Sequence, residues 1–146
     1  MKKQILTALA TAALLAALTP VAIAQNVAIV NGKAVPKARI DALAQQFAAL
    51  PIDVLLNNAG IGGGGDNQLF TRLNYDVFYE VMAVNAVGPI KVCEAFLKNV
   101  QASGQKKMIT VSSSQGSIGS VDSPRLYWYR ASKSAVNMVM STWRSS

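Results

Sequence analysis

Histidine is missing from this sequence of 146 residues, and cysteine occurs once, at Cys93. Without histidine, the chain cannot build a Ser-His-Asp or Cys-His nucleophile system. A zinc site of the Cys/His type is excluded for the same reason, so we expect no metal site. A single cysteine also excludes an intrachain disulfide. Proton transfer near neutral pH must therefore use tyrosine, lysine or one of seven carboxylates.

Charge is scarce as well: charged residues make up 14% of the chain, and hydrophobic residues make up 51%. This composition excludes a solvated, disordered chain. The length predicts one domain with a core of its own. The net charge of +7 is dispersed, and no basic stripe is interleaved with aromatic residues. We therefore expect a positive surface and no nucleic-acid partner.

The first 24 residues have the three parts of a secretory signal peptide. Lys2 and Lys3 form a short positive start, Ile5–Leu18 is apolar, and Ala22–Ala24 offers a cleavage site before Gln25. The apolar run is too short to span a bilayer about 30 Å thick. The sequence therefore predicts a signal peptide over residues 1–24, export to the periplasm or beyond, and no membrane contact once the leader is removed.

Strand and helix patterns alternate along the rest of the chain. Apolar, β-branched runs predict strands over residues 26–30, 52–56 and 107–111. Helical spacing predicts helices over residues 37–49, from 74 to about 103 with a break or kink at Gly88-Pro89, and from 127 to about 143. The run 52–56 is typical of a buried parallel strand. This order indicates an α/β fold whose strands form one parallel sheet with right-handed crossovers.

Two features outside this pattern have more than one interpretation. The run Gly62–Gly65 either brings backbone close to a ligand or forms a flexible loop, and the bare run favours the loop. Cys93 falls among the apolar positions of its helix, so we expect a buried, inert thiol.

Tyr129 and Lys133 are the residues best placed for proton chemistry. Their i, i+4 spacing on a predicted helix puts both side chains on one face. A free tyrosine has a pKa of about 10, and a nearby ammonium favours the phenolate. A tyrosine in this setting can give a proton to a carbonyl oxygen or take one from an alcohol. Tyr127 lies six residues before Lys133 and is predicted to face elsewhere.

Four motifs in order resemble the short-chain dehydrogenase/reductase family, from its fourth strand to its active-site helix. They are residues 52–60, 84–89, 109–117 and 129–133. The stretch 129–140 looks most like the C-factor and sniffer-type carbonyl reductase branch. Over residues 51–146 the resemblance implies a partial Rossmann-like parallel sheet, that is, a truncated doubly wound α/β fold. It also implies an NAD(P)-dependent oxidoreductase that moves hydride to or from a carbonyl or alcohol.

The resemblance assigns catalytic roles residue by residue. Tyr129 matches the catalytic acid/base, and Lys133 matches the lysine that holds the nicotinamide ribose and favours the phenolate. Ser113 matches the serine that hydrogen-bonds the substrate oxygen, with Ser112 and Ser114 as neighbours that a shift of register would select instead.

The resemblance also implies a cofactor site and partners. Asn85 matches the asparagine that positions a water in a proton relay. Asn58, Ala59 and Gly60 match the segment that lines the cofactor, together with Tyr129 and Lys133. The cofactor is NAD or NADP, the substrate is a small carbonyl or alcohol, and a homo-oligomer or self-association is expected.

The residues upstream depart from this family. Its members begin with a T-G-x-x-x-G-x-G turn, whose glycines let the backbone approach the pyrophosphate. The strand–turn–helix over residues 27–36 has one glycine, Gly32, and Pro36 has no N–H to offer an anion. The family's second and third strands have no counterpart either.

Residues 1–48 resemble the signal peptide and N-terminal start of periplasmic parvulin-type peptidyl-prolyl isomerases. We therefore expect a short strand–helix segment of different origin over residues 25–50, joined to a partial dehydrogenase domain over residues 51–146. The sequence also stops at Ser146, within the predicted active-site helix. A fusion or a truncation is the organisation expected.

Three functions stay open from the sequence. The first is the oxidoreductase. The second is a non-catalytic exported fragment or fusion that keeps the motifs but lacks a usable cofactor site. The third is a chaperone-like periplasmic binding module formed by residues 25–50. The leader favours a periplasmic or secreted location, and the cytoplasm usual for the reductase family is the alternative.

Expression in bacteria should give a periplasmic chain that begins at Gln25, because all three parts of the signal peptide are present. Determining the N-terminal residue of the fractionated protein checks this. A chain found only in the cytosol with Met1 intact would contradict it.

Overall fold

A parallel pair of strands forms the centre of the fold. The computed structural model describes residues 26–30 and 33–143. Strand β3, Val54–Asn57, pairs in parallel with β6, Lys107–Thr110, in the register Val54↔Lys107 to Asn57↔Thr110. Both predicted strands and their parallel pairing are confirmed, with bounds shifted by one or two residues.

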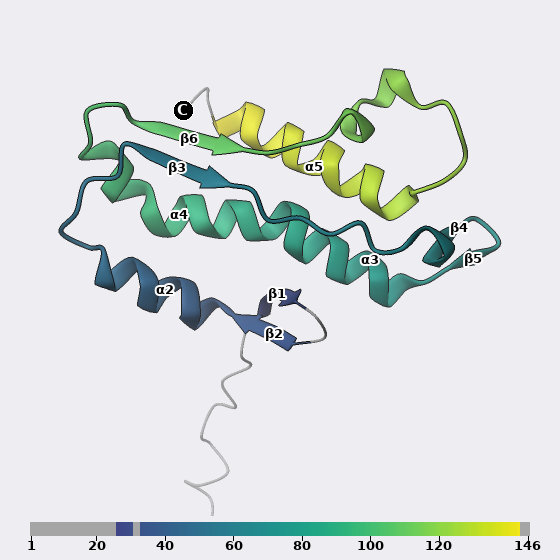
Figure 1. The fold of residues 1–146 in the computed structure, drawn as a ribbon, viewed down its shortest axis with the longest axis horizontal. Helices are drawn as coiled ribbons and strands as arrows, with labels where there is room; N and C mark the ends of the chain where they lie inside the picture. The colour runs from purple at the N-terminus through teal and green to yellow at the C-terminus, as the bar shows by residue number, and fades with distance from the viewer. Residues whose placement is uncertain (1–25, 31–32, 144–146) are drawn as a thin grey trace, which may run out of the picture.

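Helices cover one face of this pair. Helix α3 is Tyr75–Met82, α4 is Gly88–Gln101 and α5 is Tyr127–Trp143. Figure 1 shows α4 beneath β3 and β6, with helix α2, Lys37–Gln46, on the far side of α4 from the sheet. No helix of residues 26–30 and 33–143 has the length and apolar character needed to cross a membrane.

The N-terminal strand does not join the parallel sheet. Strand β1, Asn26–Val30, pairs antiparallel with β2, Lys33–Pro36, as a separate hairpin. The expectation of one parallel sheet that includes residues 26–30 is therefore wrong. Closing a short loop costs less conformational entropy than a long crossover, so the neighbouring run 33–36 takes the pairing. Residues 31–32 lie outside the described residues.

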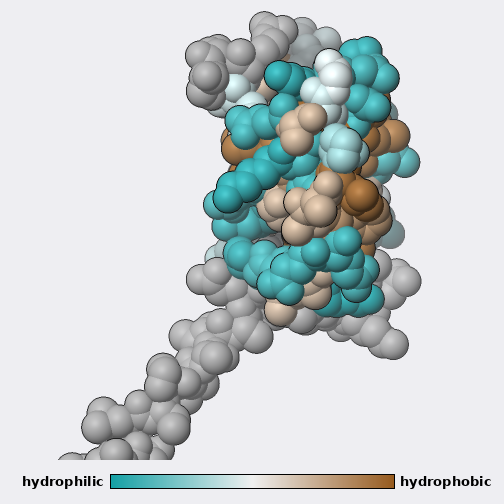
Figure 2. All heavy atoms as spheres, turned by 90° about the vertical axis from the view of Figure 1, so that its left-hand side faces the viewer, coloured by the Kyte–Doolittle hydropathy of each residue, from teal (hydrophilic) through white to brown (hydrophobic). Residues whose placement is uncertain are grey.

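The outer face of the central pair is exposed, which corrects the expectation of a buried strand over 52–56. Leu56 is 57% exposed, and its neighbours Val54, Ile109 and Val111 are exposed too. Parallel strands are buried on both faces only when helices cover both. In the described part of the chain, helices lie against one. Figure 2 shows apolar side chains at the surface between hydrophilic ones, on the end of the molecule that faces left in Figure 1.

The long helical stretch contains a widened turn. Asn74 is the N-cap of α3, and its Oδ1 accepts from the amides of Asp76 and Val77 at 3.0 and 3.4 Å. Residues Ala83–Val87 then form a π-helical turn before α4. Pro89 has no N–H to donate to the carbonyl of Asn85, four residues before it, and π turns often mark functional positions. The predicted interruption at Gly88-Pro89 thus takes the form of a π turn just before the proline.

The core lies between these helices. It consists of Val81, Val84, Ala86, Cys93, Phe96, Val100 and Val136. Cys93 is fully buried, and burial raises the pKa of its thiol, so the prediction of a buried cysteine is confirmed.

One glycine of the run, Gly63, packs against α3. Gly63 and Gly64 are left-handed, with φ of 74° and 70°. A Cβ on Gly63 would lie 2.7 Å from Val81 Cγ2 and 2.8 Å from Val77 Cγ1. The close approach of backbone that the run allows is therefore to a helix at Gly63, and the flexibility of the rest of the run stays a prediction.

Gly63→Ala should lower the free energy of unfolding by about 2–4 kcal/mol, because it combines a left-handed alanine with overpacking against α3. Denaturant unfolding measures this. Gly62→Ala is the matched control, since nothing lies within 4 Å of its Cβ position, and it should change stability by less than about 0.5 kcal/mol. Equal effects of both changes would contradict the packing described.

Candidate active site

Two loops meet at the carboxyl ends of β3 and β6, where ligands bind in parallel α/β sheets. The loop after β3 carries Asn58, Ala59 and Gly60, and all three are exposed. The loop after β6 begins at Val111, whose amide donates to the carbonyl of Asn57 at 2.8 Å. This bond continues the ladder past the strands and keeps the two loops adjacent.

Lys133 brings a buried ammonium to this edge. Its residue is 5% exposed, and its Nζ donates to the carbonyl of Val111 at 3.0 Å. The same Nζ lies 5.8 Å from the centre of the Tyr129 ring and 3.6 Å from the Cβ position of Gly60. The i, i+4 pair predicted from the sequence therefore shares one face of α5, and that face meets the loop at Gly60.

Asn85 joins the β3 loop to α5. It is 1% exposed, and its Oδ1 accepts from the amide of Ile61 at 2.8 Å. Its Nδ2 donates to the carbonyl of Ile61 and to Ser132 Oγ, both at 2.9 Å. Ser132 Oγ donates in turn to the carbonyl of Tyr129 at 2.8 Å. Both N–H groups of the amide are thus used on protein partners, and Asn85 braces the loop against the helix.

The three candidate serines differ in their surroundings. Ser113 caps a short 3-10 turn, Ser114–Gly116, by accepting from the amide of Gln115 at 3.2 Å. Its own hydroxyl proton stays available for an acceptor. Ser112 Oγ is buried and has no hydrogen-bond partner among the described residues, whereas Ser114 is exposed. In the described part of the chain no hydrogen bond joins Ser113 to Tyr129, so its role stays a prediction.

Asp122 does not compete as a proton donor. A hydrogen bond from Ser123, and then one from Arg130 at 3.1 Å, hold the pKa of the Asp122 carboxyl below its usual value. The carboxylate is therefore ionised near neutral pH. Asp53 lies at the other end of the sheet, where its Oδ1 accepts from the amide of Gln105 at 3.2 Å.

Two residues at the site were not identified from the sequence. A Cβ on Gly116 would lie 2.9 Å from the carbonyl of Lys133, so this glycine lets the serine loop pack against α5. Gln68 accepts from the amide of Tyr129 at 2.9 Å through its Oε1. Gly116 follows the serine run at a spacing that could have indicated it, but Gln68 belongs to no motif.

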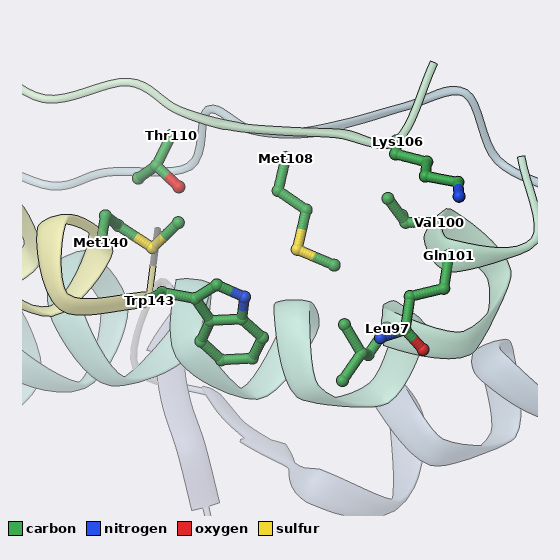
Figure 3. Close-up of a pocket in the computed structure, with 8 residues that line it drawn as sticks. All are labelled: Leu97, Val100, Gln101, Lys106, Met108, Thr110, Met140 and Trp143. Atoms are coloured by element: carbon green, nitrogen blue, oxygen red, sulfur yellow. The ribbon is translucent and has the colours of Figure 1, made fainter. Parts of the chain in front are cut away.

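A cavity of about 360 Å³ lies elsewhere, between α4, β6 and the end of α5 (Figure 3). Its lining consists of Leu97, Val100, Gln101, Lys106, Met108, Thr110, Met140 and Trp143. Figure 3 shows Met108 and Trp143 lying close to one another across this space. None of the predicted site residues lines it, so its walls offer no link to the proton chemistry.

The arrangement of two strand ends, a tyrosine–lysine helix and a serine loop matches a known family. The family model of the short chain dehydrogenases matches residues 5–146. The chain belongs to this family. The C-signal protein of Myxococcus xanthus is 36% identical over 103 residues, which are 68% of this chain and 58% of that protein. The (+)-neomenthol dehydrogenase of Arabidopsis thaliana is 33% identical over 91 residues, 52% of this chain and 30% of that enzyme.

Solved structures of the family share the fold. A Burkholderia multivorans short-chain dehydrogenase/reductase with bound NADP has a TM-score of 0.63 at 28% identity, covering 73% of this chain and 46% of that one. An Escherichia coli CFT073 short chain dehydrogenase complexed with NADPH has a TM-score of 0.65 at 26% identity, covering 75% and 44%. The chain thus spans between 30% and 58% of the length of these four relatives. The Rossmann-like α/β fold class and the resemblance to this family are confirmed.

The family uses NAD(P), and the site fits one end of such a cofactor. The exposed backbone of residues 58–60 and the Lys133 ammonium suit a nicotinamide ribose. The pyrophosphate needs backbone amides at a glycine-rich helix start. Within the described residues the run Gly62–Gly65 does not supply such a start, because it leads into the short 3-10 turn Gly65–Asn67 and not into an α-helix.

Binding of NADPH or NADH should therefore be weak, with a dissociation constant no tighter than about 1 mM, equivalent to roughly −4 kcal/mol. The physical reason is the missing set of backbone donors for the pyrophosphate. Isothermal titration calorimetry measures this constant directly. Micromolar affinity would show that residues other than a glycine-rich turn hold the phosphates.

Proposed function

We propose that this chain carries the proton-transfer site of an NAD(P)-dependent oxidoreductase acting on a small carbonyl or alcohol. One observation carries the proposal: the buried Lys133 ammonium lies 5.8 Å from the Tyr129 ring and is held by Val111 at the carboxyl edge of the sheet. A fixed positive charge near a phenol stabilises the negative charge that the phenol oxygen gains when it gives up its proton, which supports an acid/base role for Tyr129.

In the direction of reduction, Tyr129 gives its phenolic proton to the substrate oxygen. The nicotinamide, when bound, supplies the hydride that the carbonyl carbon gains. Lys133 stabilises the phenolate left on Tyr129, and its burial strengthens that attraction by lowering the local dielectric constant. In oxidation of an alcohol, Tyr129 takes the proton back.

The neighbouring residues orient the reactants. The Ser113 hydroxyl donates to the substrate oxygen, which its place on the β6 loop supports. Asn85 holds the backbone of the cofactor-lining segment through Ile61, and a role in positioning a water would fall to its remaining acceptor capacity. Asn58, Ala59 and Gly60 line the nicotinamide end, and Gly60 leaves room beside the Lys133 ammonium.

The proposal extends to the form of the cofactor, the location of the protein and its self-association. NAD and NADP are both candidates, and the E. coli relative with bound NADPH supports the phosphorylated form. The leader, which lies outside the described residues, supports export to the periplasm, with the cytoplasm as the alternative. The exposed apolar side chains Val54, Leu56, Ile109 and Val111 support self-association.

A non-catalytic exported fragment is the second candidate. The lack of a glycine-rich phosphate turn favours it, because such a chain would keep the motifs without retaining the cofactor. Turnover at saturating cofactor separates the two functions.

Tyr129→Phe should reduce carbonyl reduction by about 10² to 10⁴-fold, because it removes the proton donor and keeps the ring. The assay follows NADPH oxidation with several small aldehydes and ketones, at cofactor concentrations above about 1 mM to offset the weak binding expected. Tyr127→Phe is the matched control on the same helix. Tyr127 packs against Phe70, with ring centres 5.9 Å apart, so losing its hydroxyl should cost little.

A measurable activity that survives Tyr129→Phe and is lost in Tyr127→Phe would show that the register is wrong. No activity in the intact chain at any cofactor concentration would favour the non-catalytic fragment.

A further inference from the structure

Gln68 is a fully buried polar side chain that the proposed mechanism does not use. Gln68 is 0% exposed. It is the first residue of the two-residue strand β4, Gln68–Leu69, which pairs with β5, Arg72–Leu73. A buried amide is costly unless its donors and acceptor find partners. All of them do here. The partners are two glycine carbonyls and the backbone of Tyr129.

The donor side of Gln68 is matched to the glycine run. Its Nε2 donates to the carbonyl of Gly62 at 2.7 Å and to that of Gly64 at 3.0 Å. Both carbonyls converge on one amide nitrogen because Gly63 and Gly64 are left-handed, a conformation that glycine adopts without strain. The glycine run thus forms a socket for Gln68, at the end of the loop that begins with residues 58–60.

The acceptor side of Gln68 caps α5. The first amides of a helix have no partner within it, and Tyr129 contributes the third amide of a helix that begins at Tyr127. Gln68 Oε1 accepts from this amide at 2.9 Å, from 61 residues away in the sequence. Figure 1 shows β4 beside the start of α5.

Tyr129 is consequently held on both sides of its backbone. Its amide is fixed by Gln68, and its carbonyl accepts from Ser132 Oγ, which is bound by Asn85. Asn85 binds the loop after β3 at Ile61, and Gln68 binds the same loop at Gly62. The two restraints therefore fix the tyrosine relative to the cofactor-lining loop.

We propose that Gln68 is a positioning residue for Tyr129. By holding the Tyr129 amide, it fixes the distance and the orientation of the tyrosine side chain relative to the loop 58–61. The inference rests on the proposed function for its effect on turnover. Gln68 does not touch the reacting atoms, so it acts through the Tyr129 backbone alone. A displacement of about 1 Å can reduce turnover about 10²-fold.

Two variants separate the two sides of the amide. Gln68→Met keeps a similar volume and removes the donors and the acceptor. Gln68→Glu keeps an acceptor for the Tyr129 amide, and because a buried carboxylate would face two carbonyl oxygens, the side chain stays protonated and keeps one donor. Asn99→Leu is the matched control, because Asn99 is also a buried amide that donates to two carbonyls, those of Phe47 and Leu50, far from the site.

Amide hydrogen exchange of Tyr129 is the first readout and needs neither cofactor nor substrate. Gln68→Met should speed exchange at Tyr129 by about tenfold, whereas Gln68→Glu and Asn99→Leu should leave it near the value of the unaltered chain. The NMR signals of the Tyr129 ring should shift in Gln68→Met and stay in place in Asn99→Leu. Unchanged exchange and unchanged ring signals in Gln68→Met would overturn the proposal.

Steady-state kinetics is the second readout. Gln68→Met should lower kcat by about 10 to 100-fold with KM changed by less than about threefold, and Gln68→Glu should recover part of that loss. An equal loss of kcat in Asn99→Leu would assign the effect to general destabilisation and overturn the proposal. If the unaltered chain shows no turnover, the proposed function fails, and the exchange and ring signals alone decide whether Gln68 positions Tyr129.

Discussion

The side-chain amide of Asn85 is the contact on which the site depends. It binds both backbone groups of Ile61 and, through Ser132, the carbonyl of Tyr129. One buried residue thus ties the end of β3, the middle of the long helical stretch and the start of α5 together. Because both of its N–H groups are used, moving any of these three segments would leave a buried polar group without a partner, which costs about 1–3 kcal/mol.

The parts of this arrangement that follow local rules could be predicted from the sequence. The i, i+4 spacing of Tyr129 and Lys133 places them on one face of any helix, and the apolar runs at residues 52–56 and 107–111 mark the parallel strands. Cys93 could be placed inside from the periodicity of its neighbours. Each of these properties is set within a few residues, where backbone geometry alone decides.

The parts that could not be predicted depend on partners distant in the chain, or on which element covers which. Burial of β3 would need helices on both faces of the sheet. The apolar run alone does not show that one face is exposed. An apolar run such as residues 26–30 can pair in a parallel sheet or in a hairpin, and its composition does not show that it pairs with β2. The bond from the Tyr129 amide to Gln68 joins residues 61 positions apart, and no periodic pattern marks a single buried glutamine.

The π turn at Ala83–Val87 has a consequence for the phase of the helical stretch. Each residue of an α-helix advances about 100° around the axis, and a π turn holds one additional residue in a single wider turn, so the apolar positions after it are shifted by one residue in the sequence. Such a turn lets Val81 before it and Cys93 after it both face the core, although an uninterrupted α-helix would let the apolar stripe drift around the axis. A deletion of one residue in this turn would therefore give a continuous α-helix in which Val81 and Cys93 still share one side, whereas a deletion elsewhere in α4 would turn the rest of that helix by about 100°.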